Sequence, residues 1–314
     1  MAGWRFPLNP RAETENPAMP IIVGVPRSGT TLLRFMLDSH PLLAIPPETG
    51  FLPCIATSAE AGRIGKEDLF RVVTAFPPDA PGWDDFGLDK NEYWKELQRV
   101  EPFTVTEGVR AFYRLYARKE NKPRCGEKTP GYCEHIPAIR GMLPEAHFLH
   151  IIRDGRDAAL SLRRTWFAPG KDMPTLAAYW KRLVRRAREA GLGSPAYLEV
   201  RYEDLVTNPQ PTLQAICSFI NLVFHPAMLR YWERTPVRLR EHKTRRRADG
   251  GVIVTHEQRL EQQRLTTRSP QSGRISRWRI EMTAQEHAEF LGVAGDLLEE
   301  LGYDHGVAHP TGLT

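Results

Sequence analysis

Apolar residues along the chain follow two patterns: short uninterrupted runs, and longer stretches in which they recur at helical spacing. The short runs predict buried strands over 20–25, 42–45, 147–152 and 197–200. The helical spacing predicts helices over 30–40, 134–143, 154–166, 174–190, 209–221 and 283–301, and mostly helical structure over 50–120. Residues 240–275 have no clean period, so no regular element is predicted there.

The order of these elements indicates the fold class. The chain opens with a strand, a glycine-containing turn, a helix that Pro41 ends and a second strand, and further strands alternate with helices. This alternation predicts an α/β fold with a P-loop-like, doubly wound, mostly parallel sheet flanked by helices. We expect a single domain over residues 20–305, after an extended lead-in over 1–19 and before a tail over 306–314.

Composition excludes several classes of protein. The 314 residues are 41% hydrophobic and 26% charged, which argues against a disordered, collagenous or coiled-coil chain. No run approaches the ~18 apolar residues of a membrane span, and the N-terminal segment lacks the apolar core of a signal peptide. The four cysteines have no CxxC or metal-ligand spacing and are expected to be reduced thiols, which predicts a cytoplasmic protein.

Charge is distributed unevenly along the chain. The net charge is +5, yet the segment 238–279 alone holds twelve Lys or Arg residues and four acidic ones. This segment is a solvated basic loop, a local anion site or a nucleic-acid-binding surface, and composition alone favours the solvated loop.

The first chemical signal is the sequence GVPRSGTTLL, which covers 24–33 between the first predicted strand and the first predicted helix. Free N–H groups at a helix N-terminus and the helix dipole favour an anion at that position. Gly29 lets the backbone approach a ligand closely, and Ser28, Thr30 and Thr31 add hydroxyl donors. The sequence therefore predicts a phosphate-binding loop, with a tight turn capped by hydroxyls as the simpler alternative.

The loop differs from the ATP- and GTP-binding pattern GxxxxGK[ST]. Gly24 and Gly29 match its spacing, but Thr30 stands where that pattern needs a lysine to reach the β- and γ-phosphates. The cation of this loop is Arg27, on the other side of Gly29. The loop is therefore predicted to hold a different anion, and a P-loop nucleotide kinase or NTPase is the weaker alternative.

The second signal is FLHIIRDGRDAALSL, over 148–162. Arg153 ends the predicted strand, and Ser161 lies about two helical turns further along the chain. Both can converge on one anion at the carboxyl edge of the sheet, where ligands bind in this fold class. The alternative is a local structural role, in which salt bridges form among Arg153, Asp154, Arg156 and Asp157.

PRSGTTLL together with IIRDGRDAALSL resembles the sulfotransferase family, and the stretch over 25–51 is most similar to its tyrosylprotein branch and bacterial relatives. The resemblance covers about residues 20–305. It implies transfer of the sulfuryl group of 3′-phosphoadenosine 5′-phosphosulfate (PAPS) to an acceptor hydroxyl, which gives PAP and a sulfate ester. It also implies that Arg27 takes the place of the loop lysine of the cytosolic small-molecule enzymes.

The resemblance implies roles for individual residues. Glu48 would be the base that deprotonates the acceptor, while Arg27 and Lys128 would neutralise charge on the sulfuryl group and the leaving phosphate. The implied PAPS-binding residues are Arg27, Ser28, Gly29, Thr30, Thr31, Arg153, Ser161, Tyr202 and Arg268. Asp38 and His40 are alternative bases.

The expected chemistry sets the remaining predictions. Sulfuryl transfer resembles phosphoryl transfer, so positioning and electrostatics should dominate, and the smaller charge of the group makes a metal clamp less necessary. We therefore expect no metal.

The acceptor is a hydroxyl compound of unidentified class, because the segments 50–120 and 232–265 that would shape its site resemble nothing assignable. We expect no nucleic-acid partner and no integral membrane segment, and a homodimer is left open. A non-enzymatic polyanion binder that uses 238–279 would leave the loop motif unexplained.

Overall fold

The computed structural model describes residues 17–60, 62 and 64–306, so most of the predicted lead-in and tail lies outside the described residues. Four parallel strands form the central sheet in the order β4-β1-β5-β6. They are β1 (Met19–Gly24), β4 (Glu127–Lys128), β5 (Ala146–Ile152) and β6 (Tyr197–Arg201). The predicted parallel α/β sheet is therefore confirmed.

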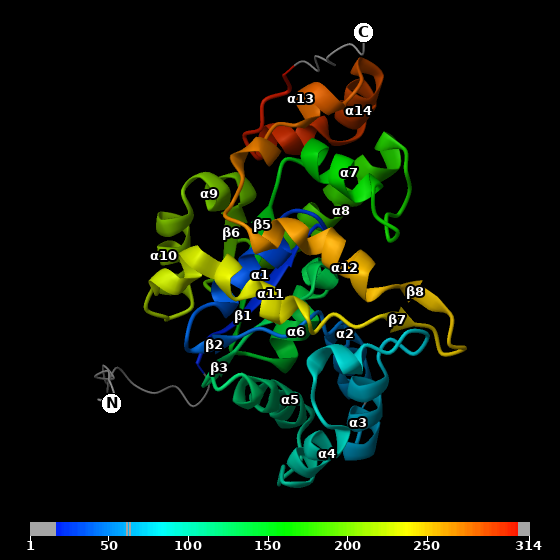
Figure 1. Ribbon diagram of the computed structural model, residues 1–314, viewed down its shortest axis with the longest axis vertical. Helices are drawn as coiled ribbons and strands as arrows, with labels where there is room; N and C mark the ends of the chain where they lie inside the picture. Colours follow the sequence, from blue (N-terminus) through cyan, green and yellow to red (C-terminus); the bar gives the residue numbers. More distant parts are fainter. Residues whose placement is uncertain (1–16, 61, 63, 307–314) are drawn as a thin grey trace.

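Helices surround this sheet. The longer ones are α1 (Thr30–Asp38), α2 (Leu52–Glu60), α3 (Lys66–Ala75), α4 (Lys90–Gln98), α5 (Val105–Lys119), α7 (Gly155–Arg163), α8 (Met173–Gly191), α10 (Pro209–Phe219), α12 (His256–Gln263) and α14 (Ala284–Glu300). The shorter ones are α6 (Ile136–Met142), α9 (Tyr202–Thr207), α11 (Thr235–Leu239) and α13 (Trp278–Glu281), with 3₁₀ turns η1 (Trp83–Phe86), η2 (Pro130–Glu134), η3 (Pro226–Glu233), η4 (Arg264–Thr267) and η5 (Ser272–Arg274). Figure 1 shows α3 and α4 at one end of the molecule and α13 and α14 at the other.

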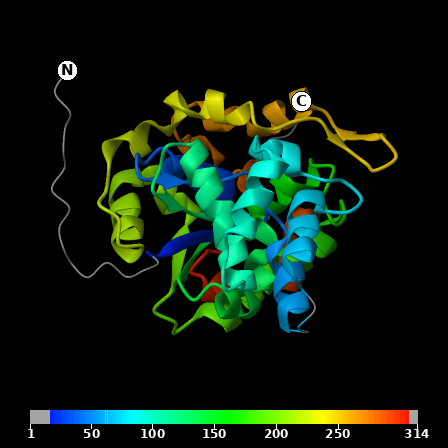
Figure 2. The same cartoon turned by 90° about the horizontal axis from the view of Figure 1, so that it is seen from below.

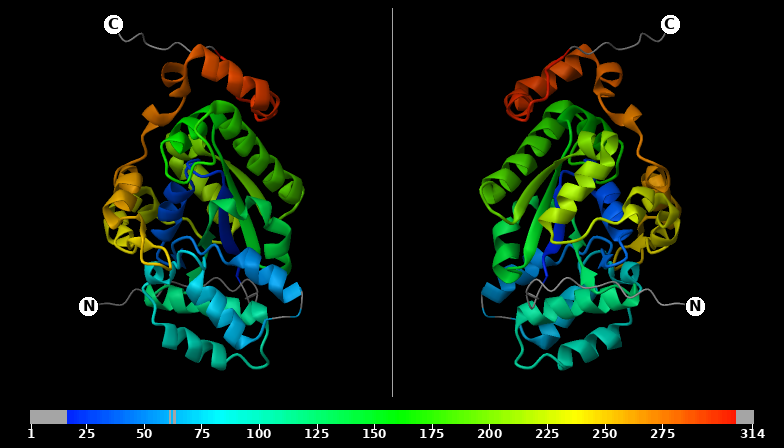
Figure 3. Two further views of the ribbon diagram at one scale, coloured as in Figure 1. Left: turned by 90° about the vertical axis from the view of Figure 1, so that its right-hand side faces the viewer. Right: turned by 90° about the vertical axis from the view of Figure 1, so that its left-hand side faces the viewer.

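The two faces of the sheet carry separate cores, because side chains alternate along each strand. In β1, Ile21 and Val23 pack in a cluster with α5, α6, α8 and α14. Ile22, between them, packs on the opposite face with α1, α9 and α10. Helices therefore cover both faces (Figure 3), which is the doubly wound arrangement that the sequence predicted.

The strand predicted over 42–45 is only two residues long and lies outside the central sheet. This strand, β2 (Leu43–Ala44), pairs in parallel with β3 (Arg124–Cys125). Pro46 and Pro47 follow at once and lack the N–H groups that a longer ladder would need. The chain leaves β2 shortly before Glu48.

The aperiodic segment 240–275 contains regular elements after all. β7 (Arg245–Arg246) and β8 (Val252–Val254) form an antiparallel hairpin, which projects from the body in Figure 2, and α12 follows it. α12 buries none of its residues, so it needs no apolar stripe, and this explains the missing helical period. The carboxylate of Asp85 in η1 holds the segment through Arg245 (2.8 Å) and Arg259 (2.7 Å).

Candidate active site

The loop between β1 and α1 adopts a backbone that few residues tolerate. Gly29 has a φ of 101° and Arg27 a φ of 73°, both in the left-handed region. A Cβ on Gly29 would lie 2.5 Å from the ring of Tyr202, so both the conformation and the space require glycine. The left-handed region costs other residues about 1 kcal/mol, and such strain at Arg27 is typical of a functional site.

This loop presents several donors to a ligand. α1 begins directly after Gly29, and the N–H groups of its first turn have no acceptor within the helix. Thr30 is buried and Thr31 half-buried at the start of that helix. Ser28 is fully buried, and its hydroxyl has no hydrogen-bond partner in the part of the chain that the structure describes. Gly29, Thr30 and Thr31 line a cavity and Ser28 does not, so the fit to a bound phosphate group rests on the N–H groups of the first turn and the two threonine hydroxyls.

Residues from the two predicted motifs meet beside the loop. Arg27 Nε donates a hydrogen bond to Ser161 Oγ (3.2 Å), and Arg153 Nη1 donates to the carbonyl oxygen of Arg27 (3.2 Å). The guanidinium carbon of Arg153 lies 4.5 Å from the centre of the Tyr202 ring. Burial and the nearby charges of Arg153 and Arg274 lower the pKa of Arg27, as expected where cations gather.

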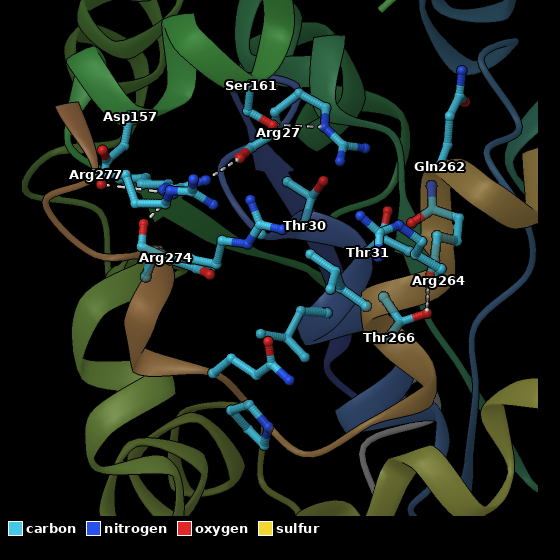
Figure 4. Close-up of a pocket in the computed structure, with 18 of the residues that line it drawn as sticks. Arg27, Thr30, Thr31, Asp157, Ser161, Gln262, Arg264, Thr266, Arg274 and Arg277 are labelled. Carbon is cyan, nitrogen blue, oxygen red and sulfur yellow. Dashed lines mark hydrogen bonds and ion pairs between the residues drawn. The ribbon is translucent and has the colours of Figure 1, made fainter. Parts of the chain in front are cut away.

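These side chains line a cavity of about 330 Å³, which we call the donor cavity. Figure 4 shows Arg27 and Ser161 in contact within it, together with side chains of the C-terminal basic segment. That segment contributes Gln262, Arg264, Thr266, Arg274 and Arg277. Part of the basic segment therefore lines the donor cavity, which favours a local anion site among the three interpretations of its charge.

Two predicted donor-site residues lie outside this lining, Arg268 and the buried Ser28. Arg268 lies in the C-terminal segment. Its side chain is exposed, and its carbonyl oxygen accepts a hydrogen bond from the Tyr231 hydroxyl (2.6 Å). Arg274 and Arg277, from the same short stretch of sequence, line the donor cavity instead. The carbonyl oxygen of Arg274 also accepts from Arg153 Nη2 (2.6 Å), which ties this stretch to the second motif.

Asp157 fixes the C-terminal segment to α7. Its carboxylate accepts the backbone N–H groups of Ser276 (2.8 Å) and Trp278 (2.9 Å), and lies 3.6 Å from Arg153. Burial raises the pKa of Asp157 to about 6. The salt-bridge alternative for the second motif is therefore also present, since Arg153 both pairs with this carboxylate and lines the donor cavity.

A second cavity of about 570 Å³, which we call the acceptor cavity, meets the donor cavity at the loop. Both are lined by Arg27, Thr30, Thr31, Gln262 and Gln263. Glu48 and Lys128, two of the three predicted catalytic residues, line only the acceptor cavity. Arg27, the third, stands between the cavities.

Glu48 and Lys128 form an ion pair in the acceptor cavity, with 2.5 Å between Lys128 Nζ and Glu48 Oε1. Their surroundings differ, because the side chain of Glu48 is 53% exposed and that of Lys128 only 5%. Burial lowers the pKa of Lys128, while the charge of Glu48 opposes that shift. A carboxylate open to the cavity can accept a proton from a bound hydroxyl, and the ammonium beside it can neutralise an anionic group.

The two alternative bases serve the fold. Asp38 is buried, pairs with Arg238 (2.9 Å) and accepts the N–H of Ile45 (2.8 Å). His40 Nε2 lies 2.8 Å from the carbonyl oxygen of Val223, and its Nδ1 accepts the N–H of Leu42. Neither side chain lines the donor or the acceptor cavity. The geometry therefore favours Glu48.

Sequence reasoning missed several lining residues of both cavities. Gln262 and Gln263 contact both, although they belong to a helix that has no apolar period. Arg274 and Arg277 were within reach, since they belong to the same RSPQSGRISRW stretch as Arg268. No signal in the sequence connected His242 with Glu48, and the structure places both in the acceptor cavity.

The remaining observations concern a metal site, a membrane-spanning helix and the cysteines. Among the described residues, no group of three or more His, Cys, Asp or Glu side chains is arranged to hold a metal ion. No helix within the described ranges is long and apolar enough to span a membrane. All four cysteines are free, as predicted.

A phosphate-type loop between two adjoining cavities is the arrangement expected of a transferase, with room for a donor on one side and an acceptor on the other. More particularly, the chain belongs to the sulfotransferase family, whose model matches residues 20–226. The family resemblance inferred from the two motifs is therefore confirmed, and nothing in these findings supports a nucleotide kinase.

Individual relatives agree with this assignment. The chain is 27% identical to the nodulation protein NoeE of Sinorhizobium fredii, over 93% of this chain and 68% of that protein. It is also 27% identical to protein-tyrosine sulfotransferase 1 of Danio rerio, over 92% of this chain and 74% of that protein. Among solved structures, the sulfotransferase domain of the Synechococcus PCC 7002 olefin synthase has 24% identity and a TM-score of 0.58, and covers 96% of this chain and 99% of that one. The last comparison supports the fold.

Proposed function

We propose that the protein transfers the sulfuryl group of PAPS to an acceptor hydroxyl, and that PAP and a sulfate ester are the products. One observation carries the proposal: the donor and acceptor cavities meet at Arg27, with Glu48 and Lys128 on the acceptor side. Family membership supports sulfuryl transfer in general. The choice of PAPS as donor rests on how its charged groups would match the donor cavity.

The donor cavity offers two separate positions for anions. The loop N–H groups and the hydroxyls of Thr30 and Thr31, which line the donor cavity, would hold the 5′-phosphosulfate at the start of α1. Arg153 and Ser161 would hold the 3′-phosphate, because the buried Nε of Arg153 has no hydrogen-bond partner among the described residues and can donate to it. The ring of Tyr202, which forms part of the same lining, would contact the adenosine.

The transfer itself needs a base for the acceptor proton and cations that stabilise the developing negative charge. The acceptor oxygen attacks sulfur in line, its proton passes to the carboxylate of Glu48, and the bond between sulfur and the bridging oxygen breaks. Arg27 and Lys128 would stabilise the negative charge that gathers on the peripheral oxygens and on the leaving phosphate. Lys128 is already desolvated, so its interaction with that charge would be stronger than in water.

Calorimetry with PAP and ATP, each with and without Mg²⁺, tests the donor. PAP is expected to bind without Mg²⁺ and more tightly than ATP, because the loop lacks the lysine that reaches a γ-phosphate. Equal affinities or a strict Mg²⁺ requirement would contradict the proposal. An RNA control in the same experiment tests the polyanion-binding alternative.

Radiolabelled PAPS tests the transfer. Phenols are the first acceptors to try, since several relatives are protein-tyrosine sulfotransferases. A metabolite extract, analysed by mass spectrometry, extends the search to other hydroxyl compounds. We further propose a cytoplasmic location and a single domain over 20–305, as the sequence predicted.

A further inference from the structure

His242 occupies an unusual position in the acceptor cavity. Its side chain lines the cavity yet is only 9% exposed. Its Nδ1 lies 2.9 Å from Nη2 of Arg259, and a guanidinium can only donate, so Nδ1 must accept. The hydrogen of the neutral ring is therefore on Nε2. In the part of the chain that the structure describes, this buried Nε2 has no hydrogen-bond partner.

Cations surround this donor. Burial, Arg259, Arg34, Lys128 and Arg245 all lower the pKa of His242 well below its usual value, so the ring is neutral at physiological pH. Arg245 and Arg259 share the single carboxylate of Asp85. Across the lining of the acceptor cavity, Arg27, Lys128, Arg245 and Arg259 face the carboxylates of Glu48, Asp79 and Asp85, so one positive charge is left over.

A buried N–H donor without a partner is costly in a neutral environment, and more costly where the local potential is positive. An anionic oxygen is the ligand that would relieve both conditions, because it accepts the hydrogen bond and neutralises the excess charge. His242, Arg245 and Arg259 belong to neither sequence motif, and none of them lines the donor cavity. The part of the acceptor cavity that they line is therefore not needed to hold PAPS.

We propose that His242, Arg245 and Arg259 form a subsite for a carboxylate of the acceptor, and that His242 Nε2 donates to it. This inference rests on the proposed function, because it assigns the larger cavity to the acceptor. The remaining lining is partly apolar and includes Trp166, Phe167, Ile253 and Val254. The expected acceptor is therefore a hydroxyl compound with an apolar or aromatic body and a carboxylate at some distance from the hydroxyl.

Two probes of equal shape isolate the carboxylate. We would measure the binding of 3-(4-hydroxyphenyl)propionate and of its neutral amide to enzyme saturated with PAP, by calorimetry, so that no turnover is needed. The carboxylate is expected to bind about 10-fold more tightly than the amide or better, the effect of one charge-assisted hydrogen bond. Equal affinities, or no binding of either probe, would overturn the subsite.

Two substitutions of similar volume separate the effect of the His242 N–H donor from the effect of the side chain's shape. His242→Leu removes the donor and should abolish the preference for the carboxylate. His242→Gln retains an N–H near the position of Nε2 and should keep most of it. PAP affinity should be unchanged in both variants, because His242 does not line the donor cavity. A preference that survives His242→Leu would overturn the role of this residue.

The outcome for the subsite is distinct from the outcome for the proposed function. If wild-type enzyme fails to bind PAP, the proposed donor is wrong. If PAP binds and a phenol is sulfated, but acceptor KM is the same for the acid and the amide, only the carboxylate subsite is wrong. In the expected case, His242→Leu raises KM for the acid and leaves kcat and the KM of the amide near wild type.

Discussion

Glu48 and Lys128 are oppositely charged, yet only one of them can act as a base. Glu48 is half-exposed to the acceptor cavity and Lys128 is buried beneath it. Glu48→Gln keeps the size of the side chain but cannot accept the acceptor proton. The rate of transfer at saturating PAPS should fall by ~10²-fold or more, since this is the usual contribution of a general base. Stopped assays with radiolabelled PAPS measure this rate.

The acidity of the acceptor provides the control for Glu48. A nitrophenol ionises without help, so the deficit of Glu48→Gln should be smaller for it than for an unsubstituted phenol. PAP affinity should stay near wild type, because Glu48 does not line the donor cavity. Weaker PAP binding with an unchanged rate of transfer would instead make Glu48 a structural acid.

Glu127, next to Lys128, makes stability depend on pH. It is fully buried, and burial raises its pKa from 4.5 to about 7, against hydrogen bonds from Thr129 and Tyr113. The folded state therefore holds this proton more tightly than the unfolded state does. The stabilisation is complete below about pH 4.5 and is lost as pH rises through about 7, and the loss is on the order of 3 kcal/mol.

Glu127→Gln tests whether stability falls as pH rises, because glutamine keeps the shape of the side chain and cannot ionise. Urea unfolding of the wild type between pH 5 and about pH 8 should show a falling free energy of unfolding, and the variant should show a flatter dependence. The variant should be the more stable protein at the alkaline end. Parallel curves for the two proteins would mean that Glu127 does not titrate in this range.

At the scale of elements, the β1–α1 loop depends on the packing of Gly29 against Tyr202. Gly29→Ala adds a Cβ that would lie 2.5 Å from the ring and also strains the left-handed backbone. We expect PAP affinity to fall by about 10-fold or more, because the loop N–H groups move away from the 5′-phosphate. Calorimetry measures the loss.

Gly193→Ala is the matched control for the loop. Gly193 has a φ of +83°, but nothing lies within 4 Å of its added Cβ, so only the backbone strain applies. This variant should lose some stability and keep the PAP affinity of the wild type. If both variants weakened PAP binding equally, general destabilisation rather than the position of the loop would explain the effect.

The sequence predicted those elements whose formation is local. β1, α1, β5 and α7 follow directly from apolar periods and from the two motifs, and the two motifs lie side by side, with Arg27 in contact with both Arg153 and Ser161. The prediction fails where position depends on tertiary contacts. No residue of helix α12 is fully buried, so it leaves no apolar period, and its place over both cavities depends partly on Asp85, far away in the chain.

The choice between Arg268 and its neighbours shows the same limit at a finer scale. Arg268, Arg274 and Arg277 are equivalent as sequence signals. The N–H groups of Ser276 and Trp278 bind Asp157, and this contact sets which arginines lie over the donor cavity. A single carboxylate on another helix therefore decides a choice that spacing alone leaves open.

At the scale of the whole molecule, the two cavities lie between the carboxyl edge of the sheet and the C-terminal segment. β1 and β5 end at the anion site, as ligand sites do in this fold class. The segment 256–281 crosses this edge and supplies residues to both cavities. Access to either cavity therefore depends on how firmly this segment is held.

Binding of PAP should hold the C-terminal segment more firmly. Arg264, Arg274 and Arg277 line the donor cavity from this segment, where an anion would bridge them to Arg27 and Arg153. Hydrogen exchange at the amides of 264–278 should slow when PAP is added, whereas exchange in α5, remote from the cavity lining, should not change. Mass spectrometry of peptic fragments measures both.

Asp157→Ala removes the carboxylate that holds the N–H groups of Ser276 and Trp278, so hydrogen exchange at these two amides should be faster before PAP is added. If PAP protected only the β1–α1 loop and left 264–278 unchanged, the basic segment would be a solvated surface rather than part of the donor site.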